Sequence, residues 1–170
     1  AQMLGRPVAP ALAVGNATVL KPAEDTSLSA LRVAALALEA GLPPGVLNVV
    51  TGLGEEAGAA LAEHPDINFI SFTGSNEVGT LVQQAAAKNA VKCVLELGGK
   101  SPQIVFDDVD VERAVPIIVR AIVQNAGQTC TAGSRLLVQR SIFDSFVAKV
   151  AEAFSKVKVG TPEMDHECGP

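Results

Sequence analysis

A thiol and a carboxylate are the residues of this sequence best suited to covalent chemistry. Cys130 lies in QNAGQTC among small and polar residues, which leave room for a substrate carbon to reach its sulfur. Glu96 lies in ELGGK, at the end of a predicted strand, where its side chain could point into a cleft. Because the thiolate is the reactive form of cysteine, this chemistry also requires nearby groups that favour the anion, such as backbone N–H groups or a cationic cofactor. The sequence therefore predicts a nucleophile at Cys130 and a proton acceptor at Glu96.

Glycines at two predicted strand-to-helix turns are candidates for binding a phosphate. Gly52, Gly54 and Ala57 in TGLGEEA formally match the GxGxxG/A fingerprint of dinucleotide sites. This signal is weak, because glycine is common at such turns for conformational reasons alone and no acidic residue follows about 20 positions later at a strand end. Gly74 and Ser75 in FTGSNEVG are the better candidate, since free N–H groups at a helix start suit a pyrophosphate.

Lys21 and Glu24 in VLKPAE are expected on a loop at the carboxyl end of a strand, where open α/β sheets bind ligands. A carboxylate at this place can accept hydrogen bonds from both ribose hydroxyls of an adenosine and would repel a 2′-phosphate. The competing interpretation is an ordinary surface ion pair between two residues three positions apart.

Short apolar runs alternate with helical patterns, which predicts an α/β fold with parallel sheet layers, flanking helices and a Rossmann-like arrangement. We expect strands over residues 13–20, 46–50, 67–72, 91–95, 103–106 and 135–139. We expect helices over about 28–38, 55–63, 76–88, 111–122 and 143–154.

Local signals place several helix ends and side chains. Thr26 and Asp110 are expected to cap helices, Gly41 to end one, and Pro116 to kink or delay another. Cys93 has the opposite strand parity from Glu96 and should fill the core. On the helix over 76–88, the side chains expected to face inward are Val78, Leu81, Val82 and Ala85.

Composition excludes several classes of function. The net charge of −5, the absence of Trp and Tyr, and the lack of a Lys/Arg stripe argue against nucleic-acid binding. No apolar run reaches the roughly 20 residues that cross a bilayer. Three cysteines without framework spacing favour a reducing, cytoplasmic setting, and no group of residues has metal-ligand spacing.

The ordered motifs closely resemble the NAD(P)-dependent aldehyde dehydrogenase superfamily, over essentially all 170 residues. The matching runs are GNATVLKPAEDTSLSAL, GLPPGVLNVVTGLG, ISFTGSNEVG, LELGGKSP and QNAGQTCTAGSR. The resemblance implies parts of two α/β domains: the latter part of the NAD-binding domain over 1–97 and the first part of the catalytic domain over 98–170. GGKSP, residues 98–102, is the boundary that the strand and helix pattern also favours. Both ends of the sequence read as cut from a longer chain.

The resemblance also assigns roles to the candidate residues. It implies that Cys130 is the nucleophile and Glu96 the general base. Cofactor contacts are implied for Lys21, Glu24, Gly54, Gly74, Ser75, Leu97 and Gly98. NAD is expected rather than NADP because of Glu24. The resemblance also implies a small aldehyde as the substrate and a homo-oligomer for the full-length enzyme.

Two hypotheses remain open from the sequence. In the first, the chain is the central catalytic part of an aldehyde dehydrogenase that forms a thiohemiacetal and then a thioester on Cys130. In the second, it is a non-catalytic dinucleotide-binding or structural fragment, because the family's upstream Asn and downstream Glu are not in this sequence. A fragment is also expected to expose apolar faces and to self-associate.

Overall fold

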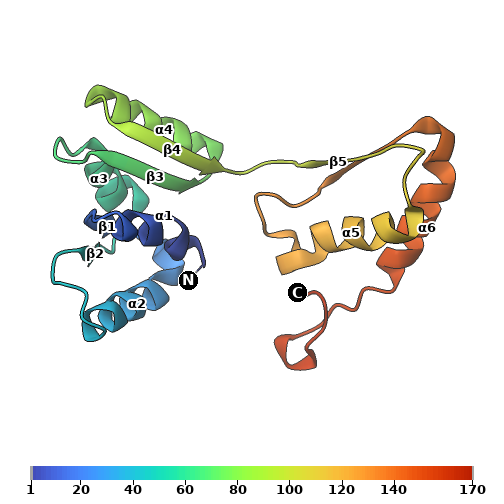
Figure 1. The fold of residues 1–170 in the computed structure, drawn as a ribbon, viewed down its shortest axis with the longest axis horizontal. Helices are drawn as coiled ribbons and strands as arrows, with labels where there is room; N and C mark the ends of the chain where they lie inside the picture. The colour runs from blue at the N-terminus through green and yellow to red at the C-terminus, as the bar shows by residue number, and fades with distance from the viewer. Residues whose placement is uncertain (1, 170) are drawn as a thin grey trace. The chain divides into compact units, whose positions relative to one another are not determined.

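The computed structural model describes residues 2–169, and the chain divides into two compact units, Ala1–Glu96 and Leu97–Pro170 (Figure 1). This division lies one residue before the boundary predicted from the sequence. Each unit combines short strands with helices, so the predicted α/β class is confirmed.

Unit 1 contains two pairs of strands. Helix α1 (Gln2–Ala13), strand β1 (Thr18–Leu20), helix α2 (Ser27–Glu39) and strand β2 (Leu47–Val49) come first, and β1 pairs with β2 in parallel. A π-helical turn over Gly54–Gly58 leads into α3 (Ala59–Glu63). Strand β3 (Phe69–Gly74), helix α4 (Asn76–Lys88) and strand β4 (Lys92–Leu97) follow, with β3 hydrogen-bonded to β4.

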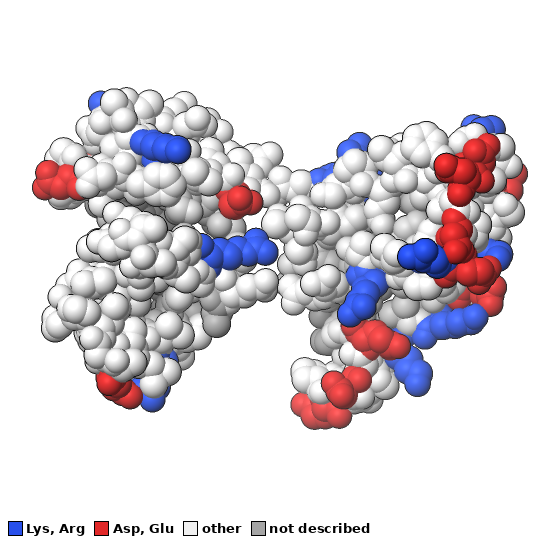
Figure 2. All heavy atoms as spheres, viewed as in Figure 1, with Lys and Arg blue, Asp and Glu red and all other residues white. Residues whose placement is uncertain are grey.

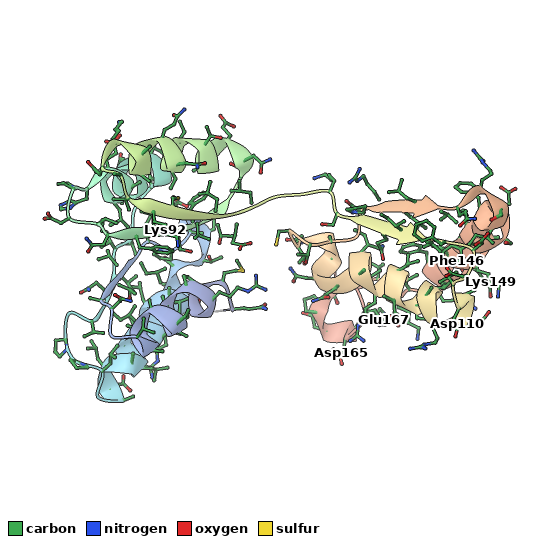
Figure 3. The ribbon with its side chains drawn as sticks, turned by 45° about the horizontal axis from the view of Figure 1, so that its top comes forward. Lys92, Asp110, Phe146, Lys149, Asp165 and Glu167 are labelled. Carbon is green, nitrogen blue, oxygen red and sulfur yellow. The ribbon has the colours of Figure 1, made fainter. Side chains whose placement is uncertain are left out.

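Unit 2 is built on strands β5 (Pro102–Val105) and β6 (Arg135–Val138), which pair in parallel. Helix α5 (Val111–Val123) follows β5, and helix α6 (Phe143–Ser155) follows β6. Phe146 lies at the centre of the core of this unit (Figure 3). Its buried partners are Val105, Val115, Ile118 and Val150.

Several predicted helix ends are confirmed. Asp110 caps α5, since its Oδ1 accepts a hydrogen bond from the N–H of Arg113 at 3.3 Å. Gly41 has φ +96° just after α2, and the N–H groups of residues 41 and 42 donate to the carbonyls of Leu38 and Ala37. This is the Schellman arrangement, in which glycine avoids the strain of a left-handed residue.

The predicted strand over 13–20 is wrong in its first half. Helix α1 runs to Ala13 and was not predicted, because Pro7 and Pro10 lie inside it and proline disfavours helix interiors. Gly15, with φ +84°, ends this helix through the same Schellman pair of hydrogen bonds. Only Thr18–Leu20 is extended.

Three further expectations need correction. Thr26 precedes α2 but its side chain makes no capping hydrogen bond, since Glu24–Thr26 forms a 3-10 turn instead. Pro116 lies within α5 and does not delay its start. Its missing N–H removes the helical partner of the Glu112 carbonyl, and Glu112 is an exposed residue, so water can take the place of that N–H. The helix predicted over 55–63 is split into a π-helical turn and a short α-helix.

The packed face of α4 also differs from the prediction. Ala85 is buried and Val82 is half-buried as expected, but Val78 and Leu81 are exposed, Leu81 by 59%. Gly79 and Ala86 are buried instead, so the packed face of α4, which contacts α3 and β3, is formed by its smallest residues.

Candidate active site

Cys130 lies in the loop over residues 124–134, which joins α5 to β6 and is called here the cysteine loop. After α5, three consecutive residues adopt left-handed conformations: Asn125 at φ 55°, Ala126 at 52° and Gly127 at 75°. The Asn125 side-chain amide donates to the carbonyl of Gln128 at 3.0 Å, and the N–H of Gln128 donates back to the carbonyl of Asn125 at 3.0 Å. This local ring reverses the chain immediately before the cysteine.

The backbone around the thiol offers unused hydrogen-bond donors. Cys130 is half-buried in a turn that closes by a bond from the N–H of Ala132 to the carbonyl of Thr129 at 3.0 Å. Among residues 2–169, the N–H groups of Cys130 and Thr131 donate to no other group. Free N–H groups beside a nucleophile suit an oxyanion that forms on a substrate carbonyl.

The segment that follows Glu96 lies against the cysteine loop. A Cβ placed on Gly99 would come within 3.3 Å of the carbonyl oxygen of Cys130, so only a residue without a side chain fits comfortably there. The Arg135 guanidinium donates through Nε to the carbonyl of Lys100 at 2.7 Å. Gly98 is exposed, and a Cβ placed on it would meet no atom within 4 Å.

Strand β4 presents Glu96 and Cys93 on opposite faces, as its parity predicts. Glu96 is exposed, whereas Cys93 and Leu97 are half-buried, and burial raises the pKa of the Cys93 thiol. The raised pKa disfavours the reactive thiolate, and Cys93 is half-buried rather than part of the buried core that its strand parity predicts. Glu96 belongs to unit 1 and Cys130 to unit 2.

Lys21, Glu24 and Gly54 are brought together in unit 1. The Lys21 ammonium donates to Glu24 Oε1 at 3.0 Å and to the carbonyl of Pro22 at 2.8 Å. Its own backbone N–H, the Lys21 ammonium and the N–H of Gly54 together hold the pKa of the Glu24 carboxyl below its ordinary value. The side chain of Lys21 is only 13% exposed, so its position is better fixed than that of a surface lysine.

The small residues of the TGLGEEA turn leave little room for larger side chains. Gly52 has φ +151°, and a Cβ on it would lie 2.9 Å from the Cβ of Ala57. A Cβ on Gly58 would be in contact with the aliphatic stem of Lys21, at 3.4 Å. π-Helical turns such as Gly54–Gly58 are frequent at functional sites. The geometry thus places the weak glycine fingerprint beside the Lys21 and Glu24 pair.

Gly74 and Ser75 lie where β3 meets α4. The Ser75 Oγ accepts a hydrogen bond from the N–H of Val78 at 3.2 Å and so caps α4. A Cβ on Gly74 would lie 2.5 Å from the ring of Phe72, so this position favours glycine. The helix start retains further N–H groups that an anion can use.

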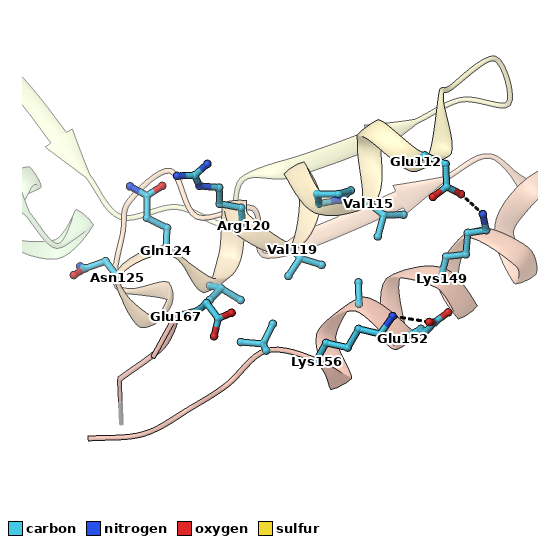
Figure 4. A pocket seen from close by; sticks show the side chains of 14 residues that line it. Glu112, Val115, Val119, Arg120, Gln124, Asn125, Lys149, Glu152, Lys156 and Glu167 are labelled. Carbon is cyan, nitrogen blue, oxygen red and sulfur yellow. Dashed lines mark hydrogen bonds and ion pairs between the residues drawn. The ribbon is translucent and has the colours of Figure 1, made fainter. Parts of the chain in front are cut away.

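A groove of about 1080 Å³ runs between α5 and α6 (Figure 4), and none of the predicted site residues lines it. Its rim carries the ion pairs Lys149–Glu112 and Lys156–Glu152, which are solvent-exposed and contribute little to stability. Acidic and basic side chains are interleaved on the face of this unit drawn in Figure 2. No group of three or more metal-ligating residues is found in the described part of the chain, and no described helix is long and apolar enough to span a membrane.

The sequence patterns do not single out Gln103, which contacts Gly133 of the cysteine loop, or Arg135, which contacts Lys100. Arg135 belongs to the quoted run QNAGQTCTAGSR, so only its membership in that run points to it. Gln103 gives one faint signal, because a polar residue occupies an inward-facing position of an apolar strand.

Comparisons with known proteins agree on one family. The profile of the Aldehyde dehydrogenase family matches residues 1–170. An aldehyde dehydrogenase of Emericella nidulans is 54% identical over 165 residues, which cover 96% of this chain and 33% of that protein.

Solved structures give the same result. Lactaldehyde dehydrogenase from Escherichia coli is 45% identical with a TM-score of 0.94, over 99% of this chain and 36% of that one. An indole-3-acetaldehyde dehydrogenase complexed with NAD⁺ is 48% identical with a TM-score of 0.90, over 94% and 33% of the two chains. The chain therefore spans about a third of the length of these relatives, and it belongs to the aldehyde dehydrogenase family.

Proposed function

We propose that this chain supplies the nucleophile, the general base and part of the dinucleotide site of an enzyme that oxidises an aldehyde to a carboxylate. The observation that carries the proposal is the cysteine loop, in which a half-buried thiol lies beside two unused N–H groups. Membership in the aldehyde dehydrogenase family supports the same chemistry.

In the first half of the reaction, the Cys130 thiolate attacks the aldehyde carbon and forms a carbon–sulfur bond. The carbonyl oxygen becomes an oxyanion, which the N–H groups of Cys130 and Thr131, unused among residues 2–169, would stabilise. Collapse of the oxyanion breaks the C–H bond and leaves a thioester. NAD⁺, when bound, accepts the hydride that leaves in this step.

In the second half, Glu96 removes a proton from water, and the resulting hydroxide attacks the thioester carbon. The carbon–sulfur bond breaks, the thiolate is regenerated and the product leaves as a carboxylate. The overall change consumes one aldehyde, one NAD⁺ and one water and yields one carboxylate, one NADH and two protons. A carboxylate in this role favours hydrolysis over transfer of the acyl group to another thiol.

The dinucleotide is proposed to bind through Lys21, Glu24 and Gly54, with Gly74 and Ser75 near its pyrophosphate and Leu97 and Gly98 near the nicotinamide. The Lys21 and Glu24 contact at 3.0 Å supports this site, because it fixes a carboxylate that can hold both ribose hydroxyls. A 2′-phosphate would meet the same negative charge, so NAD is proposed over NADP. The complex that the indole-3-acetaldehyde dehydrogenase forms with NAD⁺ supports a nicotinamide dinucleotide in general.

The pre-steady-state release of NADH tests this function in the longest natural polypeptide that contains the chain. The wild type should give a burst of NADH with an aldehyde, and Cys130→Ser should give none. Glu96→Gln should retain the burst and lose steady-state turnover, since only thioester hydrolysis needs the base. Equal turnover in the wild type and Cys130→Ser would refute the proposal.

A second candidate function is NAD⁺ binding without turnover by the 170-residue chain alone, which is favoured by its coverage of a third of its relatives. Titration with NAD⁺ followed by addition of aldehyde separates the two. Binding without NADH formation supports the second candidate, and sustained NADH formation excludes it. For the whole enzyme, a homo-oligomer and a cytoplasmic setting remain proposals; three free cysteines support the latter.

A further inference from the structure

Gln103 stands out as a polar side chain on the inward face of an apolar strand. It lies in β5 with Val105 on the same face, and Val105 is buried in the core of unit 2. Ile104, on the other face, is 62% exposed. Because an amide without partners is costly in such surroundings, a glutamine here indicates a specific hydrogen-bonding role.

The partners of Gln103 are two backbone carbonyls. Its Nε2 donates to the carbonyl of Gly133 at 3.0 Å and to that of Ile118 at 3.4 Å. Ile118 lies in the middle of α5, and Gly133 lies at the exit of the cysteine loop. One amide group therefore bridges the helix that leads into the loop and the chain that leaves it.

Gly133 is shaped to receive this amide. A Cβ on Gly133 would lie 2.4 Å from Gln103 Nε2 and 2.6 Å from its Cδ, so any other residue would displace the glutamine. The N–H of Gly133 also donates to the carbonyl of Ala121 at 3.1 Å. Both polar backbone groups of Gly133 are thus held, three residues after Cys130, while the first residues of the loop are held by the ring of Asn125 and Gln128.

We infer that Gln103 is a positioning residue that fixes the cysteine loop against α5 and so sets where the Cys130 sulfur lies. Gln103 acts through the backbone of the loop and does not touch substrate. A displacement of about 1 Å in a reacting group can cost on the order of 100-fold in rate, so loss of this bridge should affect chemistry at the sulfur. The effect on aldehyde oxidation rests on the function proposed above, whereas the effect on thiol reactivity does not.

The test compares two glutamine variants of unit 2. Gln103→Met keeps the length of the side chain and suits the apolar face but cannot donate to Gly133 or Ile118. Gln139→Met is the matched control, because Gln139 donates to Asp107 Oδ2 at 2.6 Å and accepts from the N–H of Asp107, away from the cysteine loop. Each variant loses side-chain hydrogen bonds within unit 2, but only Gln103→Met loses a bond to the cysteine loop.

The first readout is the rate at which iodoacetamide alkylates each cysteine, measured by peptide mass spectrometry. Gln103→Met should change the ratio of the Cys130 rate to the Cys93 rate by about 10-fold or more, and Gln139→Met should leave it unchanged. The second readout, in the longest natural polypeptide that contains the chain, is the NADH burst. Its rate should fall by about 10- to 100-fold in Gln103→Met, with an unchanged Kd for NAD⁺.

Equal effects of the two methionine variants on both readouts would overturn the inference, because they would show a general loss of structure. Should Gln103→Met fail to fold, Gln103→Glu replaces it: the carboxylate has the same shape and cannot donate when ionised, so a Cys130 rate like that of the wild type would again overturn the inference. A changed alkylation ratio with no NADH burst even in the wild type would support the positioning role and refute the proposed function.

Discussion

Relief of backbone strain in the cysteine loop provides a quantitative test of its conformation. Ala126 has φ 52° and ψ 33°, in the left-handed region that an L-residue occupies at a cost of roughly 1–2 kcal/mol. Glycine avoids this cost but loses more backbone entropy on folding, by about 0.5–1 kcal/mol. Ala126→Gly should therefore raise the free energy of unfolding by about 0.5–1 kcal/mol.

The neighbouring glycine should respond in the opposite way. Gly127 has φ +75°, and a Cβ on it would lie 3.3 Å from the carbonyl oxygen of Ile122. Gly127→Ala adds left-handed strain and a close contact, so it should lower the free energy of unfolding by about 1–2 kcal/mol. For a chain of 170 residues, 1 kcal/mol corresponds to a Tm change of about 2–4 °C.

Two controls calibrate the measurement by urea and thermal unfolding. Ala90 has φ 55° at the end of α4 and completes a Schellman pair of hydrogen bonds, so Ala90→Gly should stabilise by a similar amount outside the loop. Ala121 lies in α5, where Ala121→Gly should destabilise by about 1 kcal/mol. A destabilisation by Ala126→Gly as large as that by Ala121→Gly would refute the left-handed conformation of the loop.

Three further predictions concern the dinucleotide site and the exposed surface. Its own N–H and Lys21 lower the folded pKa of Glu24, so the stability that its charge contributes is present above the unfolded pKa of about 4.5 and is lost as pH falls through the lower folded pKa. Glu24→Gln should remove this part of the pH dependence of stability. Identical acid unfolding curves for the wild type and this variant would contradict the prediction. Gly52→Ala should destabilise by about 1 kcal/mol or more and weaken NAD⁺ binding, because its Cβ would meet Ala57 at 2.9 Å, and an unchanged Tm and Kd by calorimetry would show that the turn relaxes freely. The 170-residue chain should self-associate through exposed apolar side chains such as Leu28, Leu81 and Phe106, and a monodisperse monomer by light scattering would contradict this.

Elements with local signals could be predicted from the sequence. The limits of α4 and the cap of α5 at Asp110 follow from residues within one helical turn. Glu96 and Cys93 lie on opposite faces of β4 because successive side chains of a strand alternate between its two faces. These features depend on neighbours in the chain and so require no knowledge of the tertiary structure.

Features that depend on distant contacts could not be predicted. Helix α4 is apolar on two adjacent stripes, and only its packing on α3 and β3 decides that Gly79 rather than Val78 is buried. The hydrogen bond from Gln103 to Gly133 joins residues 30 positions apart, and no local sequence pattern predicts it. Of the three left-handed residues in the cysteine loop, Gly127 and, more weakly, Asn125 carry a sequence signal for that conformation, whereas Ala126 carries none.

The covalent intermediate offers the most direct test of the proposed chemistry. In Glu96→Gln, aldehyde and NAD⁺ should leave an acyl group on the peptide that contains Cys130, detected by mass spectrometry after acid quench, with about one NADH released per active site. An acyl group on Cys93 or Cys168, or NADH release without any acyl peptide, would contradict Cys130 as the nucleophile.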